Sequence, residues 1–172
     1  MTETERLAAI DALRQLKARY FRGVDTADAA LVRDILMPEC ELDYRGCFTD
    51  PVSGHDHFPA MNVVLRRSAQ WSDAMARAGI VTAHHGHTAE IEILDETHAR
   101  AIWAMTDRLW FPPGGPRAGL IGYGHYRETY EKTDRWRIRT LRLTRLRVEP
   151  MPVDQPQANA KAVSPVVAPA RS

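Results

Sequence analysis

Five polar residues lie in segments whose neighbours are mostly apolar, and their types can move a proton without an organic cofactor. They are Tyr20, Asp25, Tyr44, His84 and Asp107. A histidine can act as the base, a carboxylate can orient it, and tyrosine hydroxyls can donate to developing negative charge. No nucleotide-binding or metal-binding sequence pattern accompanies them. The set predicts cofactor-independent acid–base chemistry if the fold brings the side chains together.

Asp107 shares one face of an expected strand with apolar residues. Alternate positions of the segment 101–109 form that face, namely Ala101, Trp103, Met105 and Leu109. A carboxylate there must be paired, hydrogen-bonded or protonated, because removing its charge from water is costly. Two interpretations stay open. Asp107 is a functional group in a pocket, or it lies beyond the buried stretch and meets an arginine.

Tyr20, Tyr44 and Asp25 each have a structural interpretation beside the functional one. Tyr20 lies on the apolar stripe of an expected helix, and Tyr44 shares a strand face with Cys40 and Leu42. A buried tyrosine commonly just bonds a backbone carbonyl through its hydroxyl. Asp25 begins the run Asp-Thr-Ala-Asp, which is typical of a helix N-cap.

Three of the seven histidines, His84, His85 and His87, lie close together in the sequence. A metal site is one interpretation, but zinc in an enzyme usually takes three protein ligands, and Glu90 and Glu92 resemble surface positions. A single histidine that acts as a base is favoured, and we expect no metal. Strict alternation separates His84 from the apolar face of its strand, whereas a bulge at Gly86 would reverse that parity.

Composition restricts the classes of function. The chain has 172 residues and a net charge of +1, with 44% hydrophobic and 26% charged residues, which is typical of one globular domain. A nearly neutral chain has no field to hold a polyanion, so we expect no nucleic-acid partner. No apolar run approaches the ~20 residues of a membrane span, and the polar N-terminus is unlike a signal peptide. With Cys40 and Cys47 as free thiols, we predict a cytoplasmic protein without membrane contact.

Periodicity predicts an α+β fold, with three helices on one concave face of a strongly bent, mostly antiparallel sheet. The expected elements are helices at 4–24, 25–35 and 60–78, a strand at 39–45, and strands at 82–94, 99–111, 118–132 and 135–148. The run Pro-Pro-Gly-Gly-Pro at 112–116 predicts a hairpin tip. Residues 1–149 then form one domain, and the Pro- and Ala-rich residues 150–172 are expected to be a disordered tail.

Three stretches resemble the SnoaL-like branch of the nuclear transport factor 2-like superfamily. They read IDALRQLKARYFRGVDTADAALVRDILMPECELDYRG, TAHHGHTAEIEI and GYGHYRETYEKTDRWRIRTLRLTRL, and the resemblance covers roughly residues 5–148. It implies a cone-shaped half-barrel with a deep apolar pocket. The members that the chain resembles most are cofactor-independent lyases: bile acid 7α-dehydratase, scytalone dehydratase and hexachlorocyclohexane dehydrochlorinase.

This resemblance implies roles for the polar residues. The lyases use an aspartate–histidine dyad, and its sequence contexts match Gly23-Val24-Asp25 and the T-x-H-x-G run that contains His84. The bile acid dehydratase pattern adds two tyrosines and a second aspartate, which match Tyr20, Tyr44 and Asp107. The active-site arginine of the dehydrochlorinase falls near Leu141, so dehydrochlorination needs Arg145 as a substitute. Trp103 and Arg145 are the candidate substrate-binding residues.

The resulting hypothesis is a dehydratase that acts on a hydrophobic hydroxy-ketone, with a steroid-like or aromatic skeleton, from a catabolic route. A double-bond isomerase or a carbon–carbon lyase would use nearly the same groups. A non-catalytic binding or assembly module is the alternative from another class. Outward apolar residues of the strands, Ile102, Ala104 and Trp110, predict a homo-oligomer, and the resemblance favours a trimer.

Overall fold

The computed structural model describes residues 1–71, 74 and 79–152 of the chain. Its elements are α1 (Glu3–Asp25), α2 (Ala29–Ile35), β1 (Leu36–Asp43), the short 3-10 helix η1 (Pro59–Met61), β2 (Val64–Arg67), β3 (Val81–Ile93), β4 (His98–Trp110), β5 (Gly119–Lys132) and β6 (Trp136–Met151). A further helical segment begins at Ser68.

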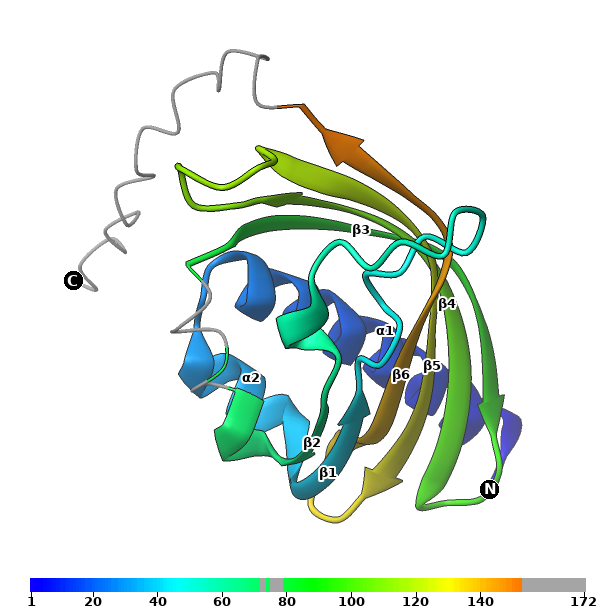
Figure 1. Ribbon diagram of the computed structural model, residues 1–172. Coiled ribbons are helices and arrows are strands. Elements are labelled where there is room, and N and C mark those ends of the chain that lie inside the picture. The colour runs from blue at the N-terminus through cyan, green and yellow to red at the C-terminus, as the bar shows by residue number, and fades with distance from the viewer. Residues whose placement is uncertain (72–73, 75–78, 153–172) are drawn as a thin grey trace, which may run out of the picture.

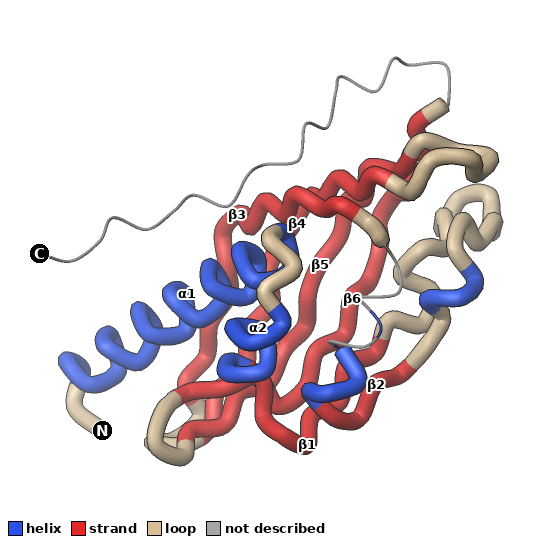
Figure 2. Tube along the Cα trace, turned by 90° about the vertical axis from the view of Figure 1, so that its left-hand side faces the viewer, coloured by secondary structure: helices blue, strands red, loops and turns tan. Residues whose placement is uncertain are grey.

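The six strands form one open sheet in the order β2-β1-β6-β5-β4-β3. The pairing of β1 with β6 is parallel and every other pairing is antiparallel. Figure 1 shows that the sheet is strongly curved and that α1 lies across its concave side, and Figure 2 shows the helices gathered on that side. The α+β class and the curved, mostly antiparallel sheet are therefore confirmed. The expected cone-shaped half-barrel is an unclosed sheet, with β2 and β3 as its end strands.

Helix α1 follows from its capping residues and its apolar stripe. Thr2 and Glu5 form a reciprocal capping box at its N-terminus. Leu13, Leu16 and Tyr20 recur at helical spacing and are at most 2% exposed, because this stripe faces the sheet. The helix ends at Asp25, one residue later than predicted, and this places the Asp25 carboxylate next to the start of β3.

The second helix begins later than the sequence predicted. Helix α2 starts at Ala29, and the side chain of Asp28, not of Asp25, accepts its capping hydrogen bond from the backbone N–H of Leu31 at 2.9 Å. The interpretation of Asp25 as an N-cap is therefore wrong. The two helices are joined through Ala27, whose positive φ of 52° makes the turn.

Three further differences from the predicted boundaries are larger than one or two residues. Strand β1 begins at Leu36 rather than at residue 39, because a bulge accommodates Pro38. The third helix was expected from residue 60, but Val64–Arg67 is strand β2, paired with β1. Of the rest of that expected helix, residues 68–71 and 74 are helical, and 72–73 and 75–78 lie outside the described residues. Strand β6 continues to Met151, where it pairs with Gly119, and residues 153–172 of the expected tail lie outside the described residues.

The core lies between α1 and the concave face of the sheet. On β4 the inward side chains alternate as predicted, and Trp103, Met105 and Asp107 are at most 6% exposed. The equivalent face of β5 carries Gly122, Gly124, Tyr126, Glu128 and Tyr130. Within the described parts of the chain, no helix is long and apolar enough to cross a membrane.

Candidate active site

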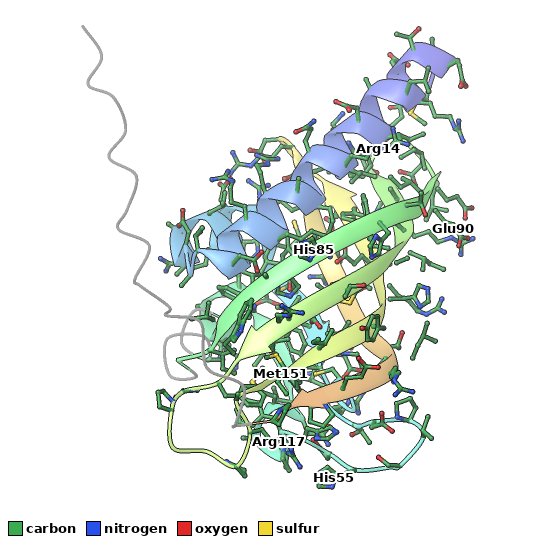
Figure 3. The ribbon with its side chains drawn as sticks, turned by 90° about the horizontal axis from the view of Figure 1, so that it is seen from above. Arg14, His55, His85, Glu90, Arg117 and Met151 are labelled. Carbon is green, nitrogen blue, oxygen red and sulfur yellow. The ribbon has the colours of Figure 1, made fainter. Side chains whose placement is uncertain are left out.

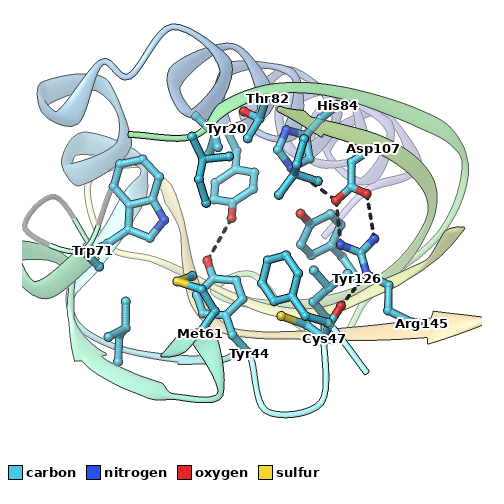
Figure 4. Close-up of a pocket in the computed structure, with 17 residues that line it drawn as sticks. Tyr20, Tyr44, Cys47, Met61, Trp71, Thr82, His84, Asp107, Tyr126 and Arg145 are labelled. Atoms are coloured by element: carbon cyan, nitrogen blue, oxygen red, sulfur yellow. Dashed lines mark hydrogen bonds and ion pairs between the residues drawn. The ribbon is translucent and has the colours of Figure 1, made fainter. Parts of the chain in front are cut away.

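A pocket opens on the concave side of the sheet (Figure 4). It lies between the C-terminal end of α1, the loop that follows β1, and strands β3 to β6. Much of its lining is apolar, including Val24, Phe48, Met61, Leu109 and Leu143. Its polar lining residues are Tyr20, Tyr44, Thr82, His84, Asp107, Tyr126 and Arg145. The fold thus brings four of the five predicted polar residues to the lining of one cavity, and the fifth, Asp25, is hydrogen-bonded to His84.

Asp25 and His84 form a hydrogen-bonded dyad. The Nδ1 atom of His84 lies 2.6 Å from Oδ1 of Asp25. Asp25 is held by two more donors: the backbone N–H of His84 at 3.0 Å and the hydroxyl of Thr82 at 2.8 Å. Three donors fix the carboxylate and keep it an acceptor, so the Nδ1 of His84 carries the proton and its Nε2 atom is left to face the cavity.

A bulge in β3 decides which histidine faces the cavity. The pairing with β4 shifts register between Gly86 and Ala89, so that His84 and Ile91 lie on the same face although an odd number of positions separates them. Gly86 is required on that face, because a Cβ there would meet Phe21 at 2.5 Å. Phe21 in turn stacks on the His84 ring, with centroids 5.4 Å apart and planes at 12°. The sequence left this parity undecided.

The neighbouring histidines lie outside the site. His85 is exposed on β3 (Figure 3), and the exposed His87 contacts the hydroxyl of Thr106 at 3.1 Å through its Nε2 atom. Across residues 1–71, 74 and 79–152, no three His, Cys, Asp or Glu side chains are grouped so that they could hold a metal ion.

Tyr20 and Tyr44 meet across the pocket through their hydroxyl groups, whose oxygens are 3.2 Å apart. Burial raises the pKa of both phenols above the usual value. Both hydroxyls are therefore neutral at neutral pH. One of the two protons bonds the partner tyrosine, and the other is available to a ligand.

Asp107 is both paired with an arginine and part of the pocket wall. Its two carboxylate oxygens accept from Nη1 and Nη2 of Arg145 at 2.9 and 2.7 Å. Asp107 is on β4 and Arg145 on β6, and the β5 residue opposite Asp107 is Gly122, where a Cβ would lie 2.4 Å from both partners. The carboxylate also faces His84, with 3.8 Å between Oδ2 and Nε2. Asp107 therefore meets an arginine, as one interpretation expected, but it does so within the buried stretch and not beyond it.

Arg145 is positioned by the loop as well as by Asp107, because its Nε donates to the backbone carbonyl of Cys47 at 2.8 Å. The thiol of Cys47 lines the pocket, and burial raises its pKa to about 12. This thiol is therefore protonated at neutral pH, and it is not an activated nucleophile.

Trp103, a predicted substrate-binding residue, does not line this pocket. Its indole N–H donates to the hydroxyl of Tyr130 at 2.8 Å within the core. Sequence analysis missed Thr82 and Tyr126, which do line the pocket. A signal for Tyr126 was present in the alternation of β5, because it shares the inward face with Gly122 and Gly124. Thr82 was quoted only as context for His84, and its bond to Asp25 depends on how α1 and β3 meet.

Solved structures with the same fold include several enzymes by name. A candidate scytalone dehydratase from Novosphingobium aromaticivorans is 16% identical, covers 90% of this chain and 99% of its own, and has a TM-score of 0.68. A hexachlorocyclohexane dehydrochlorinase from Novosphingobium barchaimii is 17% identical, covers 87% and 94%, and has a TM-score of 0.66. Rv3472 of Mycobacterium tuberculosis, of unknown function, is 22% identical, covers 84% and 76%, and has a TM-score of 0.64. At such identities these likenesses show the fold.

The sequence itself carries the family assignment. The family model described as the SnoaL-like domain matches residues 5–142, which contain nearly all of α1, strands β1 to β5, the first part of β6 and all five predicted polar residues. The chain therefore belongs to the SnoaL-like domain family.

Proposed function

We propose that this protein is a cofactor-independent lyase that eliminates water from a hydrophobic hydroxy-ketone with a steroid-like or aromatic skeleton. The observation that carries the proposal is the 2.6 Å contact between Asp25 and His84 at the wall of an apolar pocket, opposite a hydrogen-bonded tyrosine pair. A binding or assembly module has no need of a base that is oriented by a carboxylate inside its pocket.

His84 acts as the general base in this proposal. Asp25 accepts the Nδ1 proton, so the Nε2 lone pair points at the ligand. Nε2 removes a proton from the carbon next to the carbonyl group, and the electron pair moves to the carbonyl oxygen. The imidazolium that results is stabilised by Asp25 on one side and faces Asp107 on the other.

The tyrosine pair stabilises the oxyanion of the enolate. A hydroxyl of Tyr20 or Tyr44 donates to that oxygen, in a site where burial strengthens the hydrogen bond. The enolate then collapses, the carbon–carbon double bond forms, and the β-hydroxyl group leaves with the proton that His84 returns. Water is released, and both catalytic groups regain their starting protonation states.

Asp107 and Arg145 act as a neutral pair that shapes the wall beside His84. Both carboxylate oxygens of Asp107 accept from Arg145, which does not fit a role for Asp107 as a protonated donor. The guanidinium is occupied by Asp107 and by the Cys47 carbonyl, so the pocket offers little free positive charge to a ligand. A substrate whose buried part is uncharged fits this wall.

The names of the structural relatives agree with elimination, since one is a candidate dehydratase and another a dehydrochlorinase. Loss of water is favoured here over loss of chloride. Hydroxide needs a proton as it leaves, which the imidazolium of His84 supplies, and Leu141, at the position implied for the dehydrochlorinase arginine, is buried and apolar.

A substrate screen tests the proposal. Hydroxylated ketosteroids and aromatic β-hydroxy ketones are incubated with the protein, and loss of 18 mass units is followed by mass spectrometry. The wild type should convert at least one compound, His84→Ala should not, and the exposed His85→Ala should serve as the matched control. A product of unchanged mass would identify an isomerase, smaller fragments a carbon–carbon lyase, and ligand retention without conversion a binding module.

A further inference from the structure

The hydroxyl of Tyr126 is a hydrogen-bonding group that the proposed reaction has not yet used. Tyr126 lies on the inward face of β5, is 2% exposed and lines the pocket beside His84, with ring centroids 6.5 Å apart (Figure 4). Its hydroxyl makes no hydrogen bond to any residue among 1–71, 74 and 79–152, in contrast to the paired hydroxyls of Tyr20 and Tyr44. A buried phenol normally finds a partner, so a hydroxyl that opens onto a cavity indicates that a ligand supplies it.

A buried ammonium group lies against the face of the Tyr126 ring. Nζ of Lys17, on α1, is 3.6 Å from the centroid of Tyr126 and 4.4 Å from that of Tyr20. Lys17 is 1% exposed. A cation on the face of a phenol attracts the ring electrons and makes its O–H a stronger donor.

A closed network holds Lys17 in this place. Its ammonium is paired with the carboxylate of Glu128, which also accepts from the hydroxyl of Tyr130, and Tyr130 accepts from Trp103 at 2.8 Å. Burying such an ion pair is seldom more stabilising than an apolar pair of the same volume, because both charges lose their water. Stability alone therefore does not explain the buried Lys17–Glu128 pair. A role in holding a positive charge against the Tyr126 ring does explain it.

We infer that Tyr126 is a further catalytic residue that donates a hydrogen bond to the oxyanion of the bound ligand, and that Lys17 is a positioning residue that strengthens this donor through its ring. The inference rests on the proposed function, because it assigns a donor for the enolate oxygen. Together with the tyrosine pair, it defines the ligand class as uncharged, largely apolar molecules that carry an enolisable carbonyl or a phenol. The phenol stays protonated, so no bond is made or broken at Tyr126.

Binding of substituted 2-naphthols tests the inference without turnover. Their acidity is varied by ring substituents, and the dissociation constant of each is measured by fluorescence titration at one pH and one salt concentration. The wild type should bind the more acidic members more tightly. Tyr126→Phe should weaken the most acidic member about tenfold to a hundredfold and flatten the dependence on acidity. Tyr123→Phe, on the outer face of the same strand, is the matched control and should behave as the wild type.

Lys17 is tested by the double variant Lys17→Met/Glu128→Gln, which neutralises the pair and keeps an acceptor for Tyr130. It should fold and should lose about threefold to tenfold in affinity for the most acidic naphthol only. Unchanged affinity, or failure of the double variant to fold, would overturn the role of Lys17. An unchanged slope in Tyr126→Phe, or no naphthol binding to the wild type, would overturn the role of Tyr126. These results are independent of water loss in the substrate screen, which tests the function itself.

Discussion

Two polar clusters lie on the concave side of the sheet, and they differ in how completely their hydrogen bonds are satisfied. In the first, around His84, the Nε2 atom and at least one tyrosine hydroxyl are left to face a cavity. In the second, around Lys17, the ammonium, the Glu128 carboxylate and the Tyr130 hydroxyl are all bonded within the protein. The His84 cluster therefore has donors and acceptors left for a ligand, whereas the Lys17 cluster has its polar groups bonded within the protein and serves as a structural support.

This difference predicts opposite responses to substitution. Removing His84 or one of the pocket hydroxyls from the open cluster leaves no buried charge without its counter-charge, so activity should fall while stability changes little. Removing a group from the closed cluster leaves a buried charge without its partner, so stability should fall first.

The largest expected effect is the loss of turnover when the dyad is broken. His84→Ala removes the base, and Asp25→Ala removes the group that fixes its tautomer, so each should lower kcat/KM by about 10⁴-fold. The melting temperature of His84→Ala should stay near that of the wild type, whereas Asp25→Ala should lower it moderately because three hydrogen bonds to the carboxylate are lost. The two groups act as a unit, so a double variant that is far worse than either single variant would contradict the dyad.

Lys17→Met breaks the closed cluster and should be the most destabilising of these substitutions. It leaves the Glu128 carboxylate buried without its cation, which costs about 3–5 kcal/mol of unfolding free energy. Chemical denaturation measures this directly. Adding Glu128→Gln should recover most of the loss, and Tyr126→Phe, which breaks no hydrogen bond among the described residues, should cost almost nothing. Equal losses in Lys17→Met and Tyr126→Phe would remove the distinction between the clusters.

One group from each cluster, Lys17 and Tyr20, is expected to change stability with pH in opposite senses. Burial lowers the pKa of Lys17 to about 8 from 10.5, so between these values the unfolded chain binds more protons. The contribution of Lys17 to the unfolding free energy therefore rises with pH from about 8. Burial raises the pKa of Tyr20 above 10, so the folded chain keeps a proton that the unfolded chain loses, and stability falls above pH 10. The unfolding free energies of the wild type and of Lys17→Met are measured by urea denaturation across this pH range. The rise above pH 8 should be absent in the variant, and the fall above pH 10 should be present in both proteins.

The smallest effects are expected at the histidines outside the pocket. His85 is exposed, so His85→Ala should leave kcat/KM within about twofold, and surface substitutions seldom change stability by more than ~0.5 kcal/mol. Dialysis against a chelator should also leave activity unchanged. Activity lost on chelation and regained with zinc would give these histidines the metal role that the sequence left open.

Local patterns predicted α1, the four long strands and the inward face of β4, because helix and strand periodicities are recorded residue by residue. The N-cap interpretation of Asp25 failed because Asp28 offers the same chemistry three residues later, and sequence cannot rank the two. Strand β2 was taken for part of a helix because its ladder partner, β1, is some 25 residues away. The pairing of Asp107 with Arg145 depends on Gly122 between them, a three-strand relation that no single segment contains.

The resemblance to a known family supplied what periodicity did not, namely the choice of His84 over His85. It did not supply Tyr126 or Lys17. A lysine on a helix is seldom buried, and the burial of Lys17 on α1 depends on its pairing with Glu128, which is 111 positions away on strand β5.

The bulge in β3 allows the pocket residues of this strand to change in evolution independently of its core residues. Ala89, Ile91 and Ile93 keep their inward places through pairing with β4, whereas the residues before the bulge are inward only because of the extra position. A deletion of one codon between Gly86 and Ala89 would preserve the apolar face and turn His84 outward and His85 inward, away from the register that meets Asp25. A descendant of this gene could thus exchange the histidine that faces the cavity, and with it the proposed base, in a single insertion or deletion event while its fold is inherited intact.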